Sequence, residues 1–204
     1  NHSSAASDVY KRQNYKIPIS IDTRSSKVAM AFENYNIQFI NDVSSGFHDS
    51  NMLEAVSRLG CRFIMTHMPR EHKEGKIKVF DNIVDEISKY FIERIESCNK
   101  AGIKTEKLVI DPGIGFGKSG EDNLKLLNSI QSLKKVHNHI CIGSSNKKYS
   151  SRLFENIQTK EDLKIANLAT FATSTLSDAT YLRVHDVELT KDTVQVINKA
   201  QSLI

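Results

Sequence analysis

The chain has 204 residues, of which 39% are hydrophobic and 25% are charged, and its formal net charge is +4. This length and composition suffice for one domain with a sizeable core. Basic residues are interspersed with acidic ones, which disfavours a nucleic-acid partner and favours a small anionic ligand. No apolar run approaches the roughly 18 residues of a membrane span and no signal peptide appears, so we expect a cytoplasmic protein without a membrane partner.

The cysteines Cys61, Cys98 and Cys141 are odd in number, widely spaced and without a Cys-x-x-Cys pair. This pattern argues against a zinc site and against a disulfide framework. We therefore expect three reduced, mostly buried thiols.

The first 13 residues are polar and show no periodicity. Part of this segment resembles a translated sequencing adaptor rather than native protein. We therefore expect residues 1–13 to be a non-native or disordered tail, and residues 14–204 to be the folded domain.

From Ile17 onward, short apolar strands alternate with helices, a pattern typical of a parallel sheet with crossover helices. The clearest helix is expected from about residue 79 to residue 98, where an apolar stripe that includes Phe80, Ile87 and Phe91 faces the core. The six expected strands are residues 19–22, 37–42, 62–67, 108–111, 140–143 and 181–185.

The stretch from Asp111 to Lys118 follows one of these strands and precedes a helix that begins near Glu121. Its three glycines let the backbone turn sharply, approach a ligand closely and expose N–H groups, while the acid faces the pocket. The stretch does not match a phosphate-binding P-loop, because Gly113 and Gly117 enclose three residues where four are required. It therefore predicts a ligand site other than that of an ATPase or GTPase, although a plain turn remains the alternative.

Polar residues stand at the ends of all six expected strands. Each has an ordinary alternative: Asp22 or Asp42 as a helix cap, His67 as a satisfied core histidine, and Lys147 as a solvated side chain. In a parallel barrel the carboxyl ends of the strands converge and several of them build the ligand site. The polar strand ends are Asp22-Thr23, Asn41-Asp42, Thr66-His67, Asp111, the run from Ser145 to Lys147, and Arg183 with His185.

These motifs, in this order, resemble the dihydropteroate synthases of folate biosynthesis, and the resemblance runs from about Ile17 to the C-terminus. It implies an α/β fold of the TIM (β/α)8 barrel type. About six βα units would be present here, and the family's first two strands would be missing. The motifs are Ser20-Ile21-Asp22-Thr23, Ile40-Asn41-Asp42-Val43, Thr66-His67-Met68, the Asp111–Lys118 run, Gly143 to Lys147, and Arg183-Val184-His185-Asp186-Val187.

The resemblance implies a transferase in which p-aminobenzoate attacks 6-hydroxymethyl-7,8-dihydropterin pyrophosphate, giving 7,8-dihydropteroate and pyrophosphate. Asp111, Asn41 and Lys147 would hydrogen-bond the pterin ring, and the Asp22 carboxylate would stabilise positive charge that develops on it. Catalytic roles would fall to Asp22, Asp111, Lys147, Arg183 and His185, and Arg183 would also contact the pterin.

The resemblance also assigns the other two subsites. Arg183 and His185, two apart on an expected strand, would hold the departing pyrophosphate. The p-aminobenzoate site, where sulfonamides compete in the family, would be bordered by Gly115, Phe116, Ser145 and Lys147. The cofactor implied is Mg²⁺, whose expected ligand lies in the missing N-terminal segment, so no metal ligand is expected in this chain. The family usually forms homodimers.

One departure from the family concerns its Ser-Arg-Lys motif, which is Ser145-Asn146-Lys147 here and lacks one cation. Together with the missing strands, it leaves open a non-catalytic accessory or degenerate pterin-binding barrel. A pterin-dependent methyltransferase domain is a lesser alternative, because such domains share the barrel and the pterin pocket.

Overall fold

The computed structural model describes residues 17–144, 149–150 and 157–203 of the chain. Six strands alternate with helices along these residues, as the sequence predicts. The chain divides into two compact units, Asn1–Met65 with Ile95–Leu108 and Thr66–Arg94 with Val109–Ile204. The expected tail over residues 1–13 lies outside the described residues, and the division into that tail and a domain stays a prediction.

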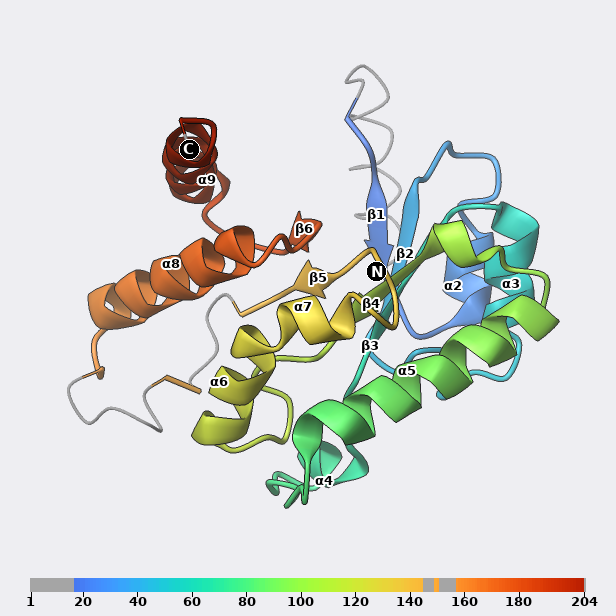
Figure 1. Cartoon of the computed structure of the whole chain (residues 1–204). Helices are drawn as coiled ribbons and strands as arrows, with labels where there is room; N and C mark the ends of the chain where they lie inside the picture. The colour runs from blue at the N-terminus through green and yellow to red at the C-terminus, as the bar shows by residue number, and fades with distance from the viewer. Residues whose placement is uncertain (1–16, 145–148, 151–156, 204) are drawn as a thin grey trace. The chain divides into compact units, whose positions relative to one another are not determined.

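The first unit is built on parallel strands that run side by side (Figure 1). Its strands are β1 (Ser20–Asp22), β2 (Phe39–Asp42) and β3 (Arg62–Thr66), the last residue of which falls in the second unit; its helices are α2 (Ser26–Met30) and α3 (Met52–Leu59). The register pairs Asp22 with Asn41, so these two polar residues are neighbours at the carboxyl ends of β1 and β2. Buried Ile40, Phe63 and Val56 belong to the core of this unit.

The second unit contains the later strands and most of the helices. Its elements are α4 (Arg70–Lys73), α5 (Ile83–Lys100), β4 (Leu108–Asp111), α6 (Gly120–Asn128), α7 (Ile130–Leu133), β5 (Cys141–Ile142), α8 (Lys160–Leu176), β6 (Tyr181–Leu182) and α9 (Val187–Gln201). Residues 95–108, which include the end of α5, the short helix η1 (Thr105–Lys107) and the first residue of β4, belong to the first unit. The short strands β5 and β6 pair in parallel, and Ile110 forms a parallel bridge with Ile140. Helix α8 packs against α9 and α6 (Figure 1).

The sequence predicts that the long helix α5 begins near residue 79, but in the structure it begins at Ile83. The Asn82 side chain accepts hydrogen bonds from the backbone N–H groups of Val84 and Asp85, at 3.1 and 3.3 Å, and so caps the helix start. Lys78 donates its backbone N–H to the Gly117 carbonyl, which keeps the preceding segment outside the helix. Phe80 is therefore not part of the helical stripe, although Ile87 and Phe91 are buried as predicted.

Strand β6 is also shorter than predicted: it ends at Leu182, whereas the sequence predicts that it continues to His185. Arg183 makes one further ladder bond to the Ile142 carbonyl, at 2.9 Å. The Asp186 side chain then accepts from the Leu189 N–H and caps α9, so the chain has to leave the strand direction. Alternation along a strand therefore does not determine on which side His185 lies.

The three cysteines are free, and all three are buried, which confirms the expected burial. In the part of the chain that the structure describes, no helix combines the length and the hydropathy that crossing a membrane requires.

Candidate functional site

Asp111, the last residue of β4, is fully buried and is held by three donors. One carboxylate oxygen, Oδ1, accepts from the Gly113 N–H at 2.8 Å. The other, Oδ2, accepts from the Arg183 guanidinium at 2.8 Å and, more weakly, from the Thr66 hydroxyl at 3.4 Å. A buried carboxylate is stable only when it is paired and hydrogen-bonded in this way. The side chain is thus fixed in its orientation.

Arg183 follows β6 and reaches Asp111 across 72 positions of the sequence. A Cβ atom at Gly143 would lie 2.5 Å from the terminal nitrogen of Arg183, so the guanidinium lies directly against the Gly143 backbone. The guanidinium needs the absence of a side chain there. The Arg183 side chain is one-third exposed, so it connects a buried carboxylate with solvent.

The glycine loop after Asp111 is folded as the sequence predicts, with positive φ angles at Gly113, Gly115 and Gly117. Gly113 has φ +73°, and a Cβ atom there would stand 2.0 Å from the His67 carbonyl oxygen. This position thus requires glycine for both its backbone angle and its space. The Asn123 side chain of α6 accepts from the Gly115 N–H at 2.7 Å and ties the loop to the helix.

Lys118, at the end of the loop, is fully buried. Its ammonium group donates to the carbonyl oxygens of Gly113 at 2.9 Å, of Phe116 at 3.1 Å and of His67 at 3.1 Å. These bonds join the two ends of the loop to the chain that follows β3. The sequence indicates no such role, because a lysine after a glycine-rich loop is as easily solvated as buried.

His67 is buried against the rings of Phe80 and Tyr90, at centroid distances of 6.2 and 4.8 Å. Burial and, to a smaller extent, the nearby charges of Lys118 and Lys78 lower its pKa from 6.5 to about 2. The ring is therefore neutral at physiological pH. His67 is therefore a core histidine, but not a fully satisfied one, because its buried Nδ1 has no hydrogen-bond partner among the described residues.

Phe116 lies at the edge of the loop, where its ring meets that of His72 edge-on at 5.0 Å. Gly117 lies tightly against His72 and Pro69. The segment after β3 therefore packs against the glycine loop and restricts the position of Phe116.

Asp22 and Asn41 belong to the first unit, where they are register neighbours on β1 and β2. Asn41 is buried and Asp22 is exposed. Asp42, next to them, accepts from Ser44 and from the Gly46 N–H, and so closes the loop after β2. Asp42 therefore has a structural role in a turn, but neither it nor Asp22 is a helix cap, because α2 and α3 have Ser25 and Asn51 at their N-cap positions.

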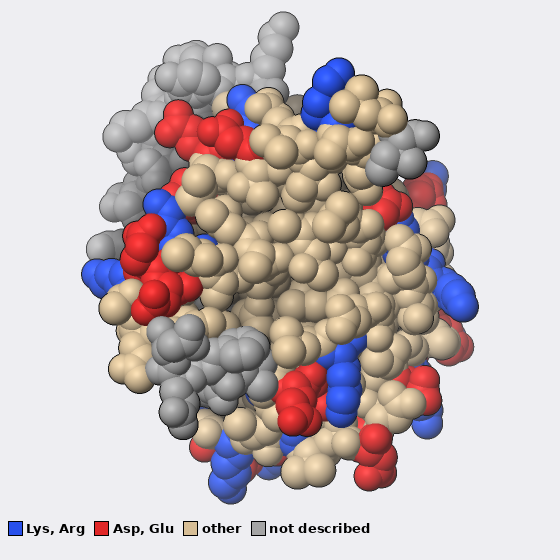
Figure 2. All heavy atoms as spheres, turned by 60° about the vertical axis from the view of Figure 1, so that its left-hand side comes forward, with Lys and Arg blue, Asp and Glu red and all other residues tan. Residues whose placement is uncertain are grey.

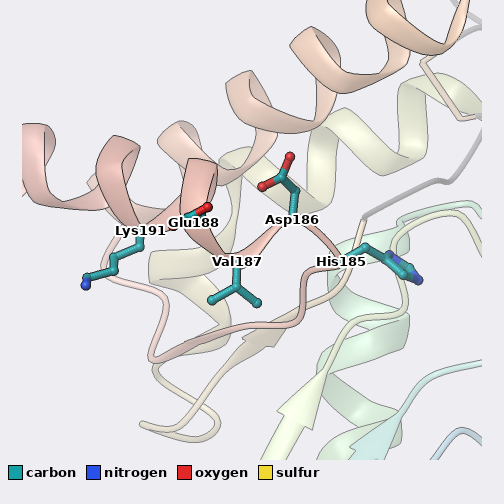
Figure 3. A pocket seen from close by; sticks show the side chains of 5 residues that line it. All are labelled: His185, Asp186, Val187, Glu188 and Lys191. Carbon is teal, nitrogen blue, oxygen red and sulfur yellow. The ribbon is translucent and has the colours of Figure 1, made fainter.

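His185 lies at the start of α9, beside an open hollow of about 710 Å³ that is also lined by Asp186, Val187, Glu188 and Lys191 (Figure 3). In this view the side chains of His185 and Lys191 point away from one another. His185 and Asp186 also line a smaller cavity of about 180 Å³ together with residues of α8.

The predicted site residues thus fall into four groups, one of which is His185 alone, beside the hollow at the start of α9. Asp111 and Arg183 are in direct contact, with Gly115 and Phe116 on the same loop as Asp111, while Asp22 and Asn41 form a separate pair. Ser145 and Lys147, with Asn146 between them, lie outside the described residues. Among the residues that are described, no group of three or more histidine, cysteine, aspartate and glutamate side chains is placed to hold a metal ion.

Comparisons of the sequence and of the structure with known proteins point to the same family. Residues 8–185 match the model of a family described as "Pterin binding enzyme". The dihydropteroate synthase of Escherichia coli K12 is 31% identical over 193 residues, which cover 93% of this chain and 67% of that protein. The mitochondrial folate synthesis bifunctional protein of Pisum sativum is 30% identical, over 87% of this chain and 37% of its own length.

Two solved structures illustrate the similarity in fold. The dihydropteroate synthase of Xanthomonas albilineans in complex with 7,8-dihydropteroate has a TM-score of 0.85 and 30% identity, over 95% of this chain and 72% of that one. The Yersinia pestis enzyme in a sulfonamide drug complex has a TM-score of 0.88 and 26% identity, over 96% and 71%. These similarities imply the TIM (β/α)8 barrel fold. This chain spans about two thirds of the length of the bacterial relatives that it matches. The chain belongs to the pterin binding enzyme family, among the dihydropteroate synthases.

Proposed function

We propose that this chain carries the pterin site of a dihydropteroate synthase. The reaction joins p-aminobenzoate to 6-hydroxymethyl-7,8-dihydropterin pyrophosphate and releases pyrophosphate. The observation that carries the proposal is the fully buried Asp111, which Arg183 and the Gly113 N–H hold in one orientation at the end of β4. The family match and the relatives named dihydropteroate synthase support it.

Asp111 would recognise the pterin through its carboxylate, which accepts hydrogen bonds from the amino-pyrimidine edge of the ring. An acceptor held in a buried site selects strongly against ligands that lack the matching donor. Asn41 and Lys147 would complete this recognition. The exposed carboxylate of Asp22, a neighbour of Asn41, would stabilise the positive charge that develops as the C–O bond breaks.

Arg183 would hold the departing pyrophosphate while it keeps its bond to Asp111. A guanidinium carries five N–H donors in a planar fork, so a bond to a carboxylate is compatible with a second bond to a phosphate. The one-third exposure of its side chain supports this double contact. His185 would assist as a second donor at the start of α9.

The p-aminobenzoate would lie against the glycine loop, bordered by Gly115 and Phe116 and by Ser145 and the stem of Lys147. The amine then attacks the methylene carbon of the pterin, the C–O bond breaks, and the amine loses its proton to solvent or to a nearby base. The protein contributes mainly the position of both substrates.

Mg²⁺ would enter with the pyrophosphate and neutralise part of its charge. This ion keeps several waters and commonly uses one or two carboxylates together with substrate phosphates, so it does not need a cage of protein ligands. We therefore place Mg²⁺ with the substrate phosphates and not in a cluster of protein side chains.

We further propose that the protein is cytoplasmic and forms a homodimer through helices α8 and α9. Both helices expose large apolar side chains, namely Ile165, Leu176, Val187 and Val196. In Figure 2, which brings the side of these helices forward, charged residues stand mainly around the rim of the face. Sedimentation velocity would measure the oligomeric state directly.

The activity is tested with the complete gene product, by measuring dihydropteroate formation from p-aminobenzoate and the pterin pyrophosphate in the presence of Mg²⁺. We expect product from the wild type and at least a 100-fold lower kcat/KM for Asp111→Asn, because the amide adds an N–H donor where the site offers an acceptor, a loss of roughly 3 kcal/mol. Asp178→Asn is the matched control, since Asp178 is exposed and its left-handed backbone suits asparagine.

The outcome also decides between this proposal and its alternative. Pterin binding without product from the wild type would favour a non-catalytic pterin-binding barrel, and Asn146→Arg would then be the first reversion to test. Equal rates for Asp111→Asn and the wild type would contradict the site assignment.

A further inference from the structure

Lys118 is the longest charged side chain among the fully buried residues of the described chain. A buried ammonium group is unfavourable unless hydrogen bonds replace its hydration. Here three carbonyl oxygens accept from it, at 2.9 to 3.1 Å, which matches the three N–H donors of the group. The geometry indicates an element that holds the backbone in place, because a solvated lysine would need none of these contacts.

The three carbonyls belong to two segments that both reach the site. The Gly113 and Phe116 carbonyls stand at the two ends of the tightest part of the glycine loop, and the Phe116 N–H also donates to the Gly113 oxygen at 3.1 Å. The His67 carbonyl belongs to the segment after β3, and its oxygen presses against Gly113. The ammonium group therefore links two points of the loop to each other and to the neighbouring segment.

We propose that Lys118 is a positioning residue for the p-aminobenzoate subsite: its ammonium group holds the loop so that Gly115 and Phe116 present one fixed edge to the substrate. The inference rests on the proposed function. Without the ammonium, three carbonyl oxygens would face one another and only the Gly113 oxygen would keep a donor, the Phe116 N–H, so electrostatic repulsion would open the loop. Asp111 would be affected less, because Arg183 and Thr66 hold its carboxylate independently.

The test compares Lys118→Met with the wild type in the complete gene product. Methionine keeps the length and apolar character of the stem and removes the charge. We expect the KM for p-aminobenzoate to rise at least tenfold and kcat to fall at least tenfold. The Kd for the pterin pyrophosphate should change less than threefold. Lys125→Met is the control, because Lys125 lies on α6 close in sequence but its side chain is mostly exposed.

Hydrogen exchange supplies a readout that does not depend on activity. The N–H groups of Gly113, Gly115 and Phe116 are hydrogen-bonded in the structure, to Asp111, Asn123 and Gly113 respectively. In Lys118→Met we expect at least tenfold faster exchange at Gly115 and Phe116, with unchanged exchange in β5 and α8. If the wild type forms no product but Lys118→Met still shows this faster local exchange, the proposed function is overturned and the loop-holding role stays intact.

Two results would overturn the inference itself. One is a folded Lys118→Met with wild-type KM and wild-type exchange. The other is an equal loss of pterin and p-aminobenzoate binding, which indicates general collapse of the site. If Lys118→Met does not fold, Lys118→Arg decides, because its planar guanidinium keeps the charge but cannot address three converging carbonyls in the same way. A folded arginine variant with a raised KM supports the inference, and one with a wild-type KM overturns it.

Discussion

Gly113 and Gly75 have the same backbone angle, φ +73°, in different surroundings. At Gly75 nothing lies within 4 Å of an added Cβ atom, whereas at Gly113 the Cβ would meet the His67 carbonyl oxygen at 2.0 Å. The pair therefore separates the cost of a left-handed backbone from the cost of a steric clash. Gly75 is needed only for the backbone angle of a turn, whereas Gly113 is also needed for the close contact between the glycine loop and His67.

We expect Gly75→Ala to lower the free energy of unfolding by about 1 kcal/mol, the usual cost of a left-handed conformation for an L-residue. Gly113→Ala should lower it by at least about 3 kcal/mol, because a rigid backbone carbonyl has to move as well. Urea denaturation followed by circular dichroism measures both. Equal losses in the two variants would show that the contact between Gly113 and His67 is not tight in solution.

At the scale of elements, the strand ends of β5 and β6 cooperate in placing one side chain. Gly143 follows β5, Arg183 follows β6, and the guanidinium that lies against Gly143 reaches Asp111 at the end of β4. The bulk that a methyl group would add at Gly143 meets the far end of a flexible arginine, which can move away without distorting the backbone. Function and stability should therefore respond differently to this substitution.

Gly143→Ala should change the free energy of unfolding by less than about 1 kcal/mol, yet lower kcat/KM at least tenfold, because it displaces Arg183 from Asp111. Steady-state kinetics and thermal unfolding of the same preparations test this. In an Arg183→Ala background, Gly143→Ala should have no further effect on kcat/KM, since the two residues act through one contact. Additive effects in this double-mutant cycle would contradict the explanation.

At the scale of the whole molecule, the buried neutral His67 makes stability depend on pH. Its folded pKa of about 2 lies below the ordinary value of 6.5, so the unfolded chain binds the proton more tightly. The stabilisation is complete above pH 6.5 and is lost as the pH falls from 6.5 towards 2, by about 1.4 kcal/mol per pH unit. At pH 5 this residue alone costs about 2 kcal/mol relative to pH 8.

His67→Gln removes this proton while keeping a polar side chain at the position. Between pH 8 and pH 5 the free energy of unfolding should fall by about 2 kcal/mol less in the variant than in the wild type. Urea titrations at both pH values measure this difference. The other carboxylates and histidines act equally in both proteins and cancel in the difference. Parallel pH profiles would show that His67 is protonated, or accessible to protons, in the folded protein.

The sequence alone determined the six strands, the buried cysteines, the glycine loop after β4 and the family, because each depends on local patterns. Apolar runs, glycines at a strand end and short motifs keep their meaning wherever the rest of the chain lies. The ends of α5 and β6 were less well predicted, since the capping side chains of Asn82 and Asp186 override the apolar pattern.

Only the tertiary structure decided which of the polar strand ends meet. The bond between Asp111 and Arg183 spans 72 positions, and one of the three carbonyls that surround Lys118 belongs to His67, 51 positions earlier. A hydrogen bond requires donor and acceptor within about 3 Å, and no spacing in a sequence encodes such a distance between separate strands. The residue types were visible in the sequence, but their contacts exist only once the chain is folded.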